Sequence, residues 1–189
     1  VRRRRIHEHC GVLRFGKDST WVMFTGDADR TAWESHITDY HKKRLPSQIL
    51  SASHHGSRTF FKDDESDDPY MTALETIDPV YVIVSAPKQS ESRHDHPHDD
   101  AMELYEDHVG KDNVLHTGAN RESYICDIFT DGTYEIRLDT SLVDKYGRDN
   151  DEEKDGKKSE TKSNASNISV RAAAPTMATK LDHRPMGNQ

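Results

Sequence analysis

Polar side chains that could bind a metal ion or transfer a proton gather at three places along the chain, each after a short apolar segment. The first is the Thr-Gly-Asp-Ala-Asp sequence of residues 25–29, which follows the apolar run 20–24. A carboxylate that leaves a buried strand through a glycine turn is a rigid oxygen ligand, so Asp27 is suited to bridging two cations. The alternative is that Asp27 or Asp29 caps the helix that follows.

The second place is the His54-His55-Gly56 turn, which follows the apolar run 48–52. Adjacent residues of an extended chain point to opposite sides, so one imidazole could face a metal ion and the other a substrate. Gly56 allows the backbone to turn tightly or to approach a ligand closely. A single histidine is usually structural or on the surface, but this pair at the end of a strand favours a role in a site.

The third place is the stretch 94–100 (His-Asp-His-Pro-His-Asp-Asp), which follows the apolar run 80–85. His94, His96 and His98, together with the neighbouring acids, could bind a divalent ion without help from the rest of the chain. The alternative is a solvated loop whose last two aspartates favour the dipole of the next helix.

A fourth, weaker feature is the sequence His7-Glu8-His9 before the first apolar run. In an extended segment, this alternate spacing would put both imidazoles on one face.

The elements that position these residues alternate between two kinds of apolar pattern. Short apolar runs bounded by turn residues predict strands, and apolar residues at spacings of three and four predict helices. The predicted strands are 11–16, 20–25, 48–52, 80–85, 113–116, 123–130 and 133–138, and the predicted helices are 29–44, 69–77 and 97–109. Pro97 is expected in the first turn of the last helix. Asp131-Gly132 predicts a hairpin turn. This alternation indicates an α/β layered domain over residues 1–140.

Composition limits both the folded region and the range of functions. From Thr140 the apolar pattern ends, and residues 141–189 are expected to be a disordered tail of charged and polar residues. The net charge of −8 argues against a broad basic surface for duplex DNA, although bound cations can reverse the sign of an acidic site. No apolar run approaches the roughly 20 residues that span a bilayer. The two cysteines indicate no disulfide framework, so a reducing, cytoplasmic location is expected.

The order of these motifs resembles a known family. The sequence is similar to the metallo-β-lactamase domain of ComEC-type DNA-uptake competence proteins in three motifs, each between a predicted strand and a predicted helix. In chain order these motifs are Thr-Gly-Asp-Ala, Ser-His-His-Gly-Ser and His-Pro-His. The resemblance covers about residues 9 to 138 and implies the C-terminal half of an αββα sandwich.

The resemblance also implies roles for individual residues. Asp27 matches the bridging carboxylate, and His54 matches a metal-binding histidine. His55 and His96 match the second histidine of the pair and the histidine of the His-Pro loop, which could orient substrate or protonate a leaving group. His9 precedes the strand at a position where the wider superfamily often has a metal ligand.

The family's main metal motif, His-x-His-x-Asp-His, is absent from this sequence, as is the first half of the sandwich. The resemblance as a whole leads us to expect a metal-dependent hydrolase of phosphodiesters or nucleic acid. The complete site would hold two divalent cations, for which zinc is the first candidate. A missing N-terminal half would be its partner. The rival hypothesis is a catalytically degenerate remnant that acts as a binding module. A third is an independent metal-binding protein that uses the loop 94–100.

Overall fold

The computed structural model describes residues 7–120, 123–139 and 170–172. Within these residues, one sheet has five strands in the order β1-β2-β3-β4-β5 and a second has three in the order β6-β7-β8. The strands of the first sheet are β1 (Leu13–Lys17), β2 (Thr20–Phe24), β3 (Ile49–Ser51), β4 (Tyr81–Val84) and β5 (Val114–His116). Those of the second are β6 (Ser123–Ile128), β7 (Tyr134–Asp139) and β8 (Val170–Ala172). The predicted mixed α/β class is confirmed.

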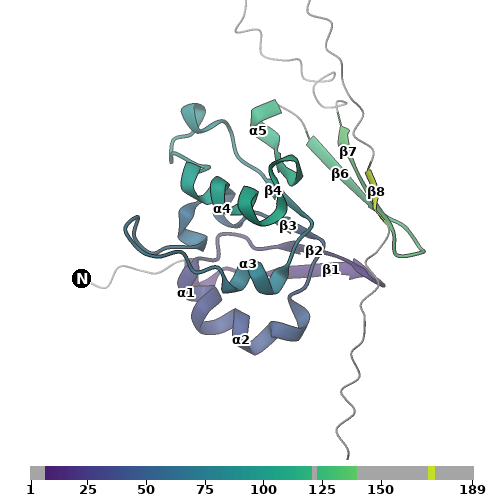
Figure 1. Ribbon diagram of the computed structural model, residues 1–189, viewed down its shortest axis with the longest axis horizontal. Helices are drawn as coiled ribbons and strands as arrows, with labels where there is room; N and C mark the ends of the chain where they lie inside the picture. Colours follow the sequence, from purple (N-terminus) through teal and green to yellow (C-terminus); the bar gives the residue numbers. More distant parts are fainter. Residues whose placement is uncertain (1–6, 121–122, 140–169, 173–189) are drawn as a thin grey trace, which may run out of the picture.

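Strand direction in the first sheet decides where the helices lie. β1 pairs with β2 as an antiparallel hairpin, whereas β2, β3, β4 and β5 run parallel to one another. Parallel strands need crossover connections of one hand, and the strands follow each other in chain order, so the connecting helices cover one face of the sheet (Figure 1).

The helices between the parallel strands agree with the predicted ones. The first covers residues 30–44 and consists of α1 (Arg30–Ala32), a π-helical segment (Trp33–Ile37), α2 (Thr38–His41) and a 3-10 turn (Lys42–Arg44). The others are α3 (Thr72–Ile77) and α4 (Asp99–Val109). A short helix that was not predicted, α5 (Thr117–Asn120), follows β5. 3-10 turns also cover His7–His9, Ser53–His55, Arg58–Phe60, Gln89–Glu91 and Lys111–Asn113.

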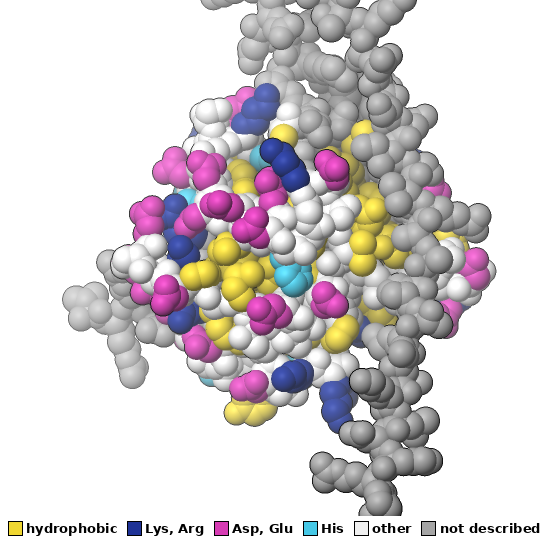
Figure 2. Space-filling view, viewed as in Figure 1, with side chains coloured by type: hydrophobic (Ala, Val, Ile, Leu, Met, Phe, Trp, Pro, Cys, Tyr) yellow, Lys and Arg dark blue, Asp and Glu magenta, His cyan; other side chains and the backbone are white. Residues whose placement is uncertain are grey.

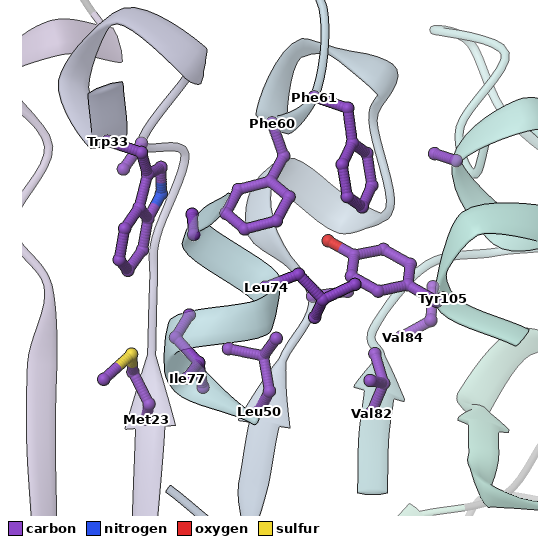
Figure 3. Packing of buried hydrophobic residues seen from close by; sticks show 14 of the residues in the cluster. Met23, Trp33, Leu50, Phe60, Phe61, Leu74, Ile77, Val82, Val84 and Tyr105 are labelled. Carbon is purple, nitrogen blue, oxygen red and sulfur yellow. The ribbon is translucent and has the colours of Figure 1, made fainter. Parts of the chain in front are cut away.

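The main hydrophobic core lies between the sheet and these helices (Figure 3). Alternate residues of the central strands point into it because side chains along a strand alternate between its two faces. The edge of the Trp33 ring meets Phe60 with centroids 5.5 Å apart. Labelled members of this core are Met23, Trp33, Leu50, Phe60, Phe61, Leu74, Ile77, Val82, Val84 and Tyr105.

The opposite face of the five-stranded sheet packs against the second sheet. Val22, Ile49 and Tyr81 contribute to this smaller core, together with Tyr134 and Ile136 from β7. The described elements therefore form three layers, which are helices, a five-stranded sheet and a three-stranded sheet. The hydroxyl of the buried Thr20 donates to the carbonyl of Gly132 at 2.6 Å, which joins the β1–β2 hairpin to the predicted Asp131-Gly132 turn.

Two local predictions are wrong. Pro97 does not lie in the first turn of α4, because the N-cap of that helix is His98. His7–His9 is a 3-10 turn and not an extended segment, so alternate spacing does not place the two imidazoles on one face. The predicted tail, 141–189, lies outside the described residues except for β8, which pairs antiparallel with β7.

The outer surface of the described region carries mixed charge. On the helix-covered face, acidic side chains lie between the Lys and Arg side chains (Figure 2). Among the described residues, no helix combines the length and apolar character needed to cross a membrane.

Candidate functional site

The turns at the carboxyl ends of β2, β3 and β4 bring the candidate residues together. The chain leaves these parallel strands at the same edge of the sheet, which is where open α/β sheets place their ligand sites. The sequence motifs at 25–29, 53–57 and 94–100 all follow these three strands.

His7, Cys10 and Asp27 form a group that could hold a metal ion. Their ligand atoms all lie within 4.8 Å of one another, and all three residues are half-buried. Ligands bound to one zinc ion at ~2.0–2.3 Å lie at most about 4.6 Å apart, so small side-chain rotations would bring these atoms onto one ion. In the part of the chain that the structure describes, Nδ1 of His7 is buried and has no hydrogen-bond partner. The donor set, an imidazole nitrogen, a thiol sulfur and a carboxylate oxygen, therefore fits a zinc-class ion.

His54 lies next to this group. Its ring centroid is 4.4 Å from that of His7 and 4.8 Å from that of His96. Nδ1 of His54 is 3.2 Å from Oγ1 of Thr59, and that hydroxyl donates its own proton to Oγ of Ser57. Thr59 can therefore accept a hydrogen bond from the Nδ1–H of His54. In that tautomer the lone pair of His54 is on Nε2, where it is available to a metal ion.

Hydrogen bonds between the turns fix the relative positions of Asp27 and His54. The amide of His54 donates to the carbonyl of Gly26 at 2.9 Å. The hydroxyl of the buried Ser53 donates to the carbonyl of Ala28 at 2.6 Å. The turn after β2 and the turn after β3 are thus joined by one backbone–backbone and one side-chain–backbone hydrogen bond, independently of any ligand.

The two aspartates of the first motif have different roles. Asp29 is the N-cap of the helix after β2, and its carboxylate accepts a hydrogen bond from the amide of Ala32 at 3.0 Å. Asp27 belongs to the group with His7 and Cys10. The capping alternative therefore applies to Asp29, and Asp27 remains the candidate ligand.

The His54-His55 turn is not extended, so the predicted reason for the divergence of the two rings is wrong. Both residues have positive φ, 48° at His54 and 59° at His55. Left-handed conformations cost a non-glycine residue roughly 1–2 kcal/mol each. Such strain, held by the surrounding packing, is typical of functional sites.

The left-handed turn directs the two rings to different partners. His55 is exposed, and its Nδ1–H donates to the carbonyl of Ser85 at 2.7 Å, which leaves the lone pair on its Nε2 facing outward. His54 points toward His7 and His96. One imidazole therefore points inward and the other outward, but the cause is the positive φ of both residues and not an extended backbone.

The His-Pro loop packs directly on the His54-His55 turn. The amide of His98 donates to the carbonyl of Gly56 at 3.1 Å. A Cβ added to Gly56 would lie 2.8 Å from Cβ of Pro97, so the loop and the turn are in close contact. The ring of His96 lies between those of His54 and His98, with centroids 4.8 and 4.9 Å away.

His98 and His94 are placed less favourably as ligands. Nδ1 of His98 accepts a hydrogen bond from the amide of Arg58 at 3.2 Å, so its proton is on Nε2 and it can only donate there when neutral. His94 is exposed, and its ring centroid is 6.1 Å from that of His96. Across the described ranges, three such ligand atoms approach within 4.8 Å of one another only in the group of His7, Cys10 and Asp27, so the loop 94–100 does not form a site of this kind alone.

Burial keeps the clustered imidazoles in their neutral form. Desolvation, with smaller contributions from the neighbouring His54 and His98, lowers the pKa of His96 to about 4. Desolvation also lowers the pKa of His54, against the opposing effect of Asp27. It lowers that of His98 as well, with a smaller contribution from Arg58. Neutral imidazoles are the form that binds metal ions and accepts protons.

Sequence reasoning chose His9 and missed His7 and Cys10. His9 is exposed and is not a member of the group. The signal that could have found the other two is their spacing of three residues, which puts side chains on the same side of a helical turn. Interpreting the segment as extended hid that signal.

Comparison with known proteins gave no match to a family model, to a curated protein or to a solved structure.

Proposed function

We propose that this chain is a metal-dependent hydrolase acting on phosphodiesters, and that its fold is the C-terminal half of a metallo-β-lactamase-type αββα sandwich. The order of the three motifs supports the proposal, as does the layering of helices, a five-stranded sheet and a second sheet. The phosphodiester specificity rests on the resemblance of the motifs to the ComEC-type domain.

The observation that carries the proposal is the clustering of candidate metal ligands of different chemical types at one edge of the sheet. Asp27, from the turn after β2, shares its group with His7 and Cys10, and His54, from the turn after β3, lies beside them. Helix capping accounts for Asp29, but a cap does not explain why Asp27 lies beside His7, whose buried Nδ1 has no hydrogen-bond partner among the described residues.

The side chains divide into those that would hold an ion and those that would meet substrate. A bound divalent ion supplies Lewis acidity and lowers the pKa of water toward neutrality. Asp27 and His54 sit in short turns fixed by hydrogen bonds between their backbones and are positioned to hold the ion.

His55, whose Nε2 lone pair faces outward, can accept a proton or a hydrogen bond from a substrate. His96, neutral at pH 7 because its pKa is lowered to about 4, fits the same accepting role better than the role of general acid.

The chain on its own would supply only part of a two-metal site, because the family's His-x-His-x-Asp-His motif is absent from it. Apolar side chains of the β1–β2 hairpin remain exposed on the sheet face that the second sheet covers only in part, where Phe15 and Phe24 line a cavity with residues of β6. Leu13 is 60% exposed, Phe15 47% and Phe24 45%, and the last two stack with centroids 5.7 Å apart. We therefore include in the proposal a separate N-terminal half that covers this surface and completes the site.

The test combines zinc content with hydrolysis of bis(p-nitrophenyl) phosphate and of single-stranded DNA. Asp27→Ala and His54→Ala are expected to remove both metal and turnover, because they hold the ion. His96→Ala is expected to lower turnover by about 10²–10⁴-fold with a smaller effect on metal content. His36→Ala, an exposed histidine on the first helix, is the control and should change neither.

The rival hypothesis is a degenerate module that binds partners without catalysis. It would be favoured by metal binding without hydrolysis even after the N-terminal half is supplied. If His96→Ala removes the metal and His54→Ala retains it, the two assigned roles are exchanged.

A further inference from the structure

We propose that Cys10 binds the metal ion as a thiolate, and that this sulfur ligand makes the site select a zinc-class ion over Mg²⁺ and Mn²⁺. The inference rests on the proposed function only in requiring a metal at Asp27. It adds a sulfur ligand that the resemblance does not supply, and with it a physical reason for the preference for zinc.

The position of Cys10 is fixed by contacts with both neighbouring turns. Its amide donates to the carbonyl of His7 at 3.3 Å, which closes the 3-10 turn and puts the two side chains on the same side. On the other side, a Cβ built on Gly26 would lie 3.9 Å from Cβ of Cys10 and 3.4 Å from the carbonyl oxygen of Gly11. The segment of residues 10–11 therefore lies directly against the turn that carries Asp27.

The buried nitrogen of His7 is an independent reason to expect a ligand here. Nδ1 of His7 has no hydrogen-bond partner among the described residues. A buried polar atom without a partner costs roughly 1–3 kcal/mol. The ligand atoms of His7, Cys10 and Asp27 lie within 4.8 Å of one another. An ion that this group held through Nδ1 of His7 would satisfy that atom.

A thiolate determines which ions the group prefers. Cysteine sulfur is a soft ligand that binds zinc and similar transition metals, whereas Mg²⁺ and Mn²⁺ prefer oxygen ligands. The thiol releases its proton to solvent as the metal–sulfur bond forms.

Cys126, the other cysteine, provides a matched control. It is also a free thiol of intermediate exposure, but it packs against the apolar cluster between the two sheets. Desolvation there raises the pKa of its thiol to about 11, so it remains protonated and inert at neutral pH. It is not a member of the ligand group.

The experiment is a titration of the metal-free protein with Co²⁺, followed by absorption spectroscopy. The wild type is expected to show a sulfur-to-cobalt charge-transfer band in the near ultraviolet. Cys126→Ala should retain this band. Cys10→Ser should lose it and bind Zn²⁺ at least about tenfold more weakly, since even residues that only orient a ligand contribute 10–100-fold to affinity.

A second measurement on the unmutated chain covers the case in which Cys10→Ser fails to fold. Thiol alkylation is followed by mass spectrometry, and Zn²⁺ should protect Cys10 while an excess of Mg²⁺ leaves it reactive. Equal alkylation of Cys10 with and without Zn²⁺ would overturn the inference.

The outcomes separate this inference from the proposed function. The wild type could bind cobalt without a charge-transfer band, and Asp27→Asn could abolish this binding. That result would support the metal site and exclude Cys10 as a ligand. Absence of any metal binding overturns both. A cobalt–sulfur band in a protein that hydrolyses no phosphodiester even after the N-terminal half is supplied supports the inference and contradicts the hydrolase.

Discussion

Substitution of Gly56 by alanine tests the close contact between the His54-His55 turn and the His-Pro loop. Gly56 has φ +79°, and an added Cβ would lie 2.8 Å from Cβ of Pro97 and 3.1 Å from Cγ1 of Val84. Neither neighbour can rotate away easily, because Pro97 is a closed ring and Val84 lies within β4.

The expected loss of stability is the sum of three effects. The left-handed conformation costs alanine about 1–2 kcal/mol, and overpacking against buried neighbours costs about 1–3 kcal/mol. The smaller entropy of the unfolded alanine chain returns about 0.4–1 kcal/mol. Gly56→Ala should therefore lower the free energy of unfolding by about 3 kcal/mol.

Gly26→Ala is the matched control, because it has positive φ without the steric contact. Gly26 has φ +52°, and its added Cβ would meet nothing closer than the carbonyl oxygen of Gly11 at 3.4 Å. Only the conformational effects remain, so we expect a loss of about 1 kcal/mol. Urea unfolding with unchanged m-values measures both. Losses that agree within about 0.5 kcal/mol would refute the close packing of the turn on the loop.

Three further tests address the roles assigned to single residues. Asp29→Asn should retain metal binding, because asparagine also caps helices, whereas Asp27→Asn should weaken metal binding at unchanged melting temperature. Asp29→Ala removes the cap and should lower the free energy of unfolding by about 1 kcal/mol, measured by thermal unfolding. Ser53→Ala leaves the carbonyl of Ala28 without its donor and should cost about 1–3 kcal/mol; an unchanged melting temperature would show that this bond is not made. Burial lowers the pKa of His96 to about 4, so the metal-free folded protein resists the protonation that the unfolded chain accepts near 6.5. Its stability should fall as pH drops from 6.5 toward 4, and His96→Gln should reduce the fall in melting temperature between pH 7 and pH 5; an equal fall would argue against burial of the imidazole.

The strands that carry the motifs could be predicted because both of their faces are buried. β2, β3 and β4 lie between the helices and the second sheet, so their sequences are continuous apolar runs that end where polar residues begin. That pattern locates the candidate residues along the chain and predicts that they meet at one edge of the sheet.

The detailed geometry of the site could not be predicted, because it depends on contacts between distant segments. The sequence alone does not decide whether Asp27 or Asp29 caps the helix, since both spacings are compatible with a cap. The contribution of His7 depends on a 3-10 turn that no apolar periodicity marks. The left-handed conformation of His54 depends on its hydrogen bond to Gly26, 28 residues earlier in the sequence.

The antiparallel pairing of β1 with β2 has a consequence for folding kinetics. His7, Cys10 and Asp27 flank this hairpin, so a nearly local event, the closing of one short pair of strands, brings them together. His54 and His96 join only after β3 and β4 have added by parallel pairing, which is slower because each addition closes a longer loop. A partly folded chain would therefore already present three ligands. The rate of zinc binding, measured during refolding, would distinguish formation of the hairpin from completion of the sheet.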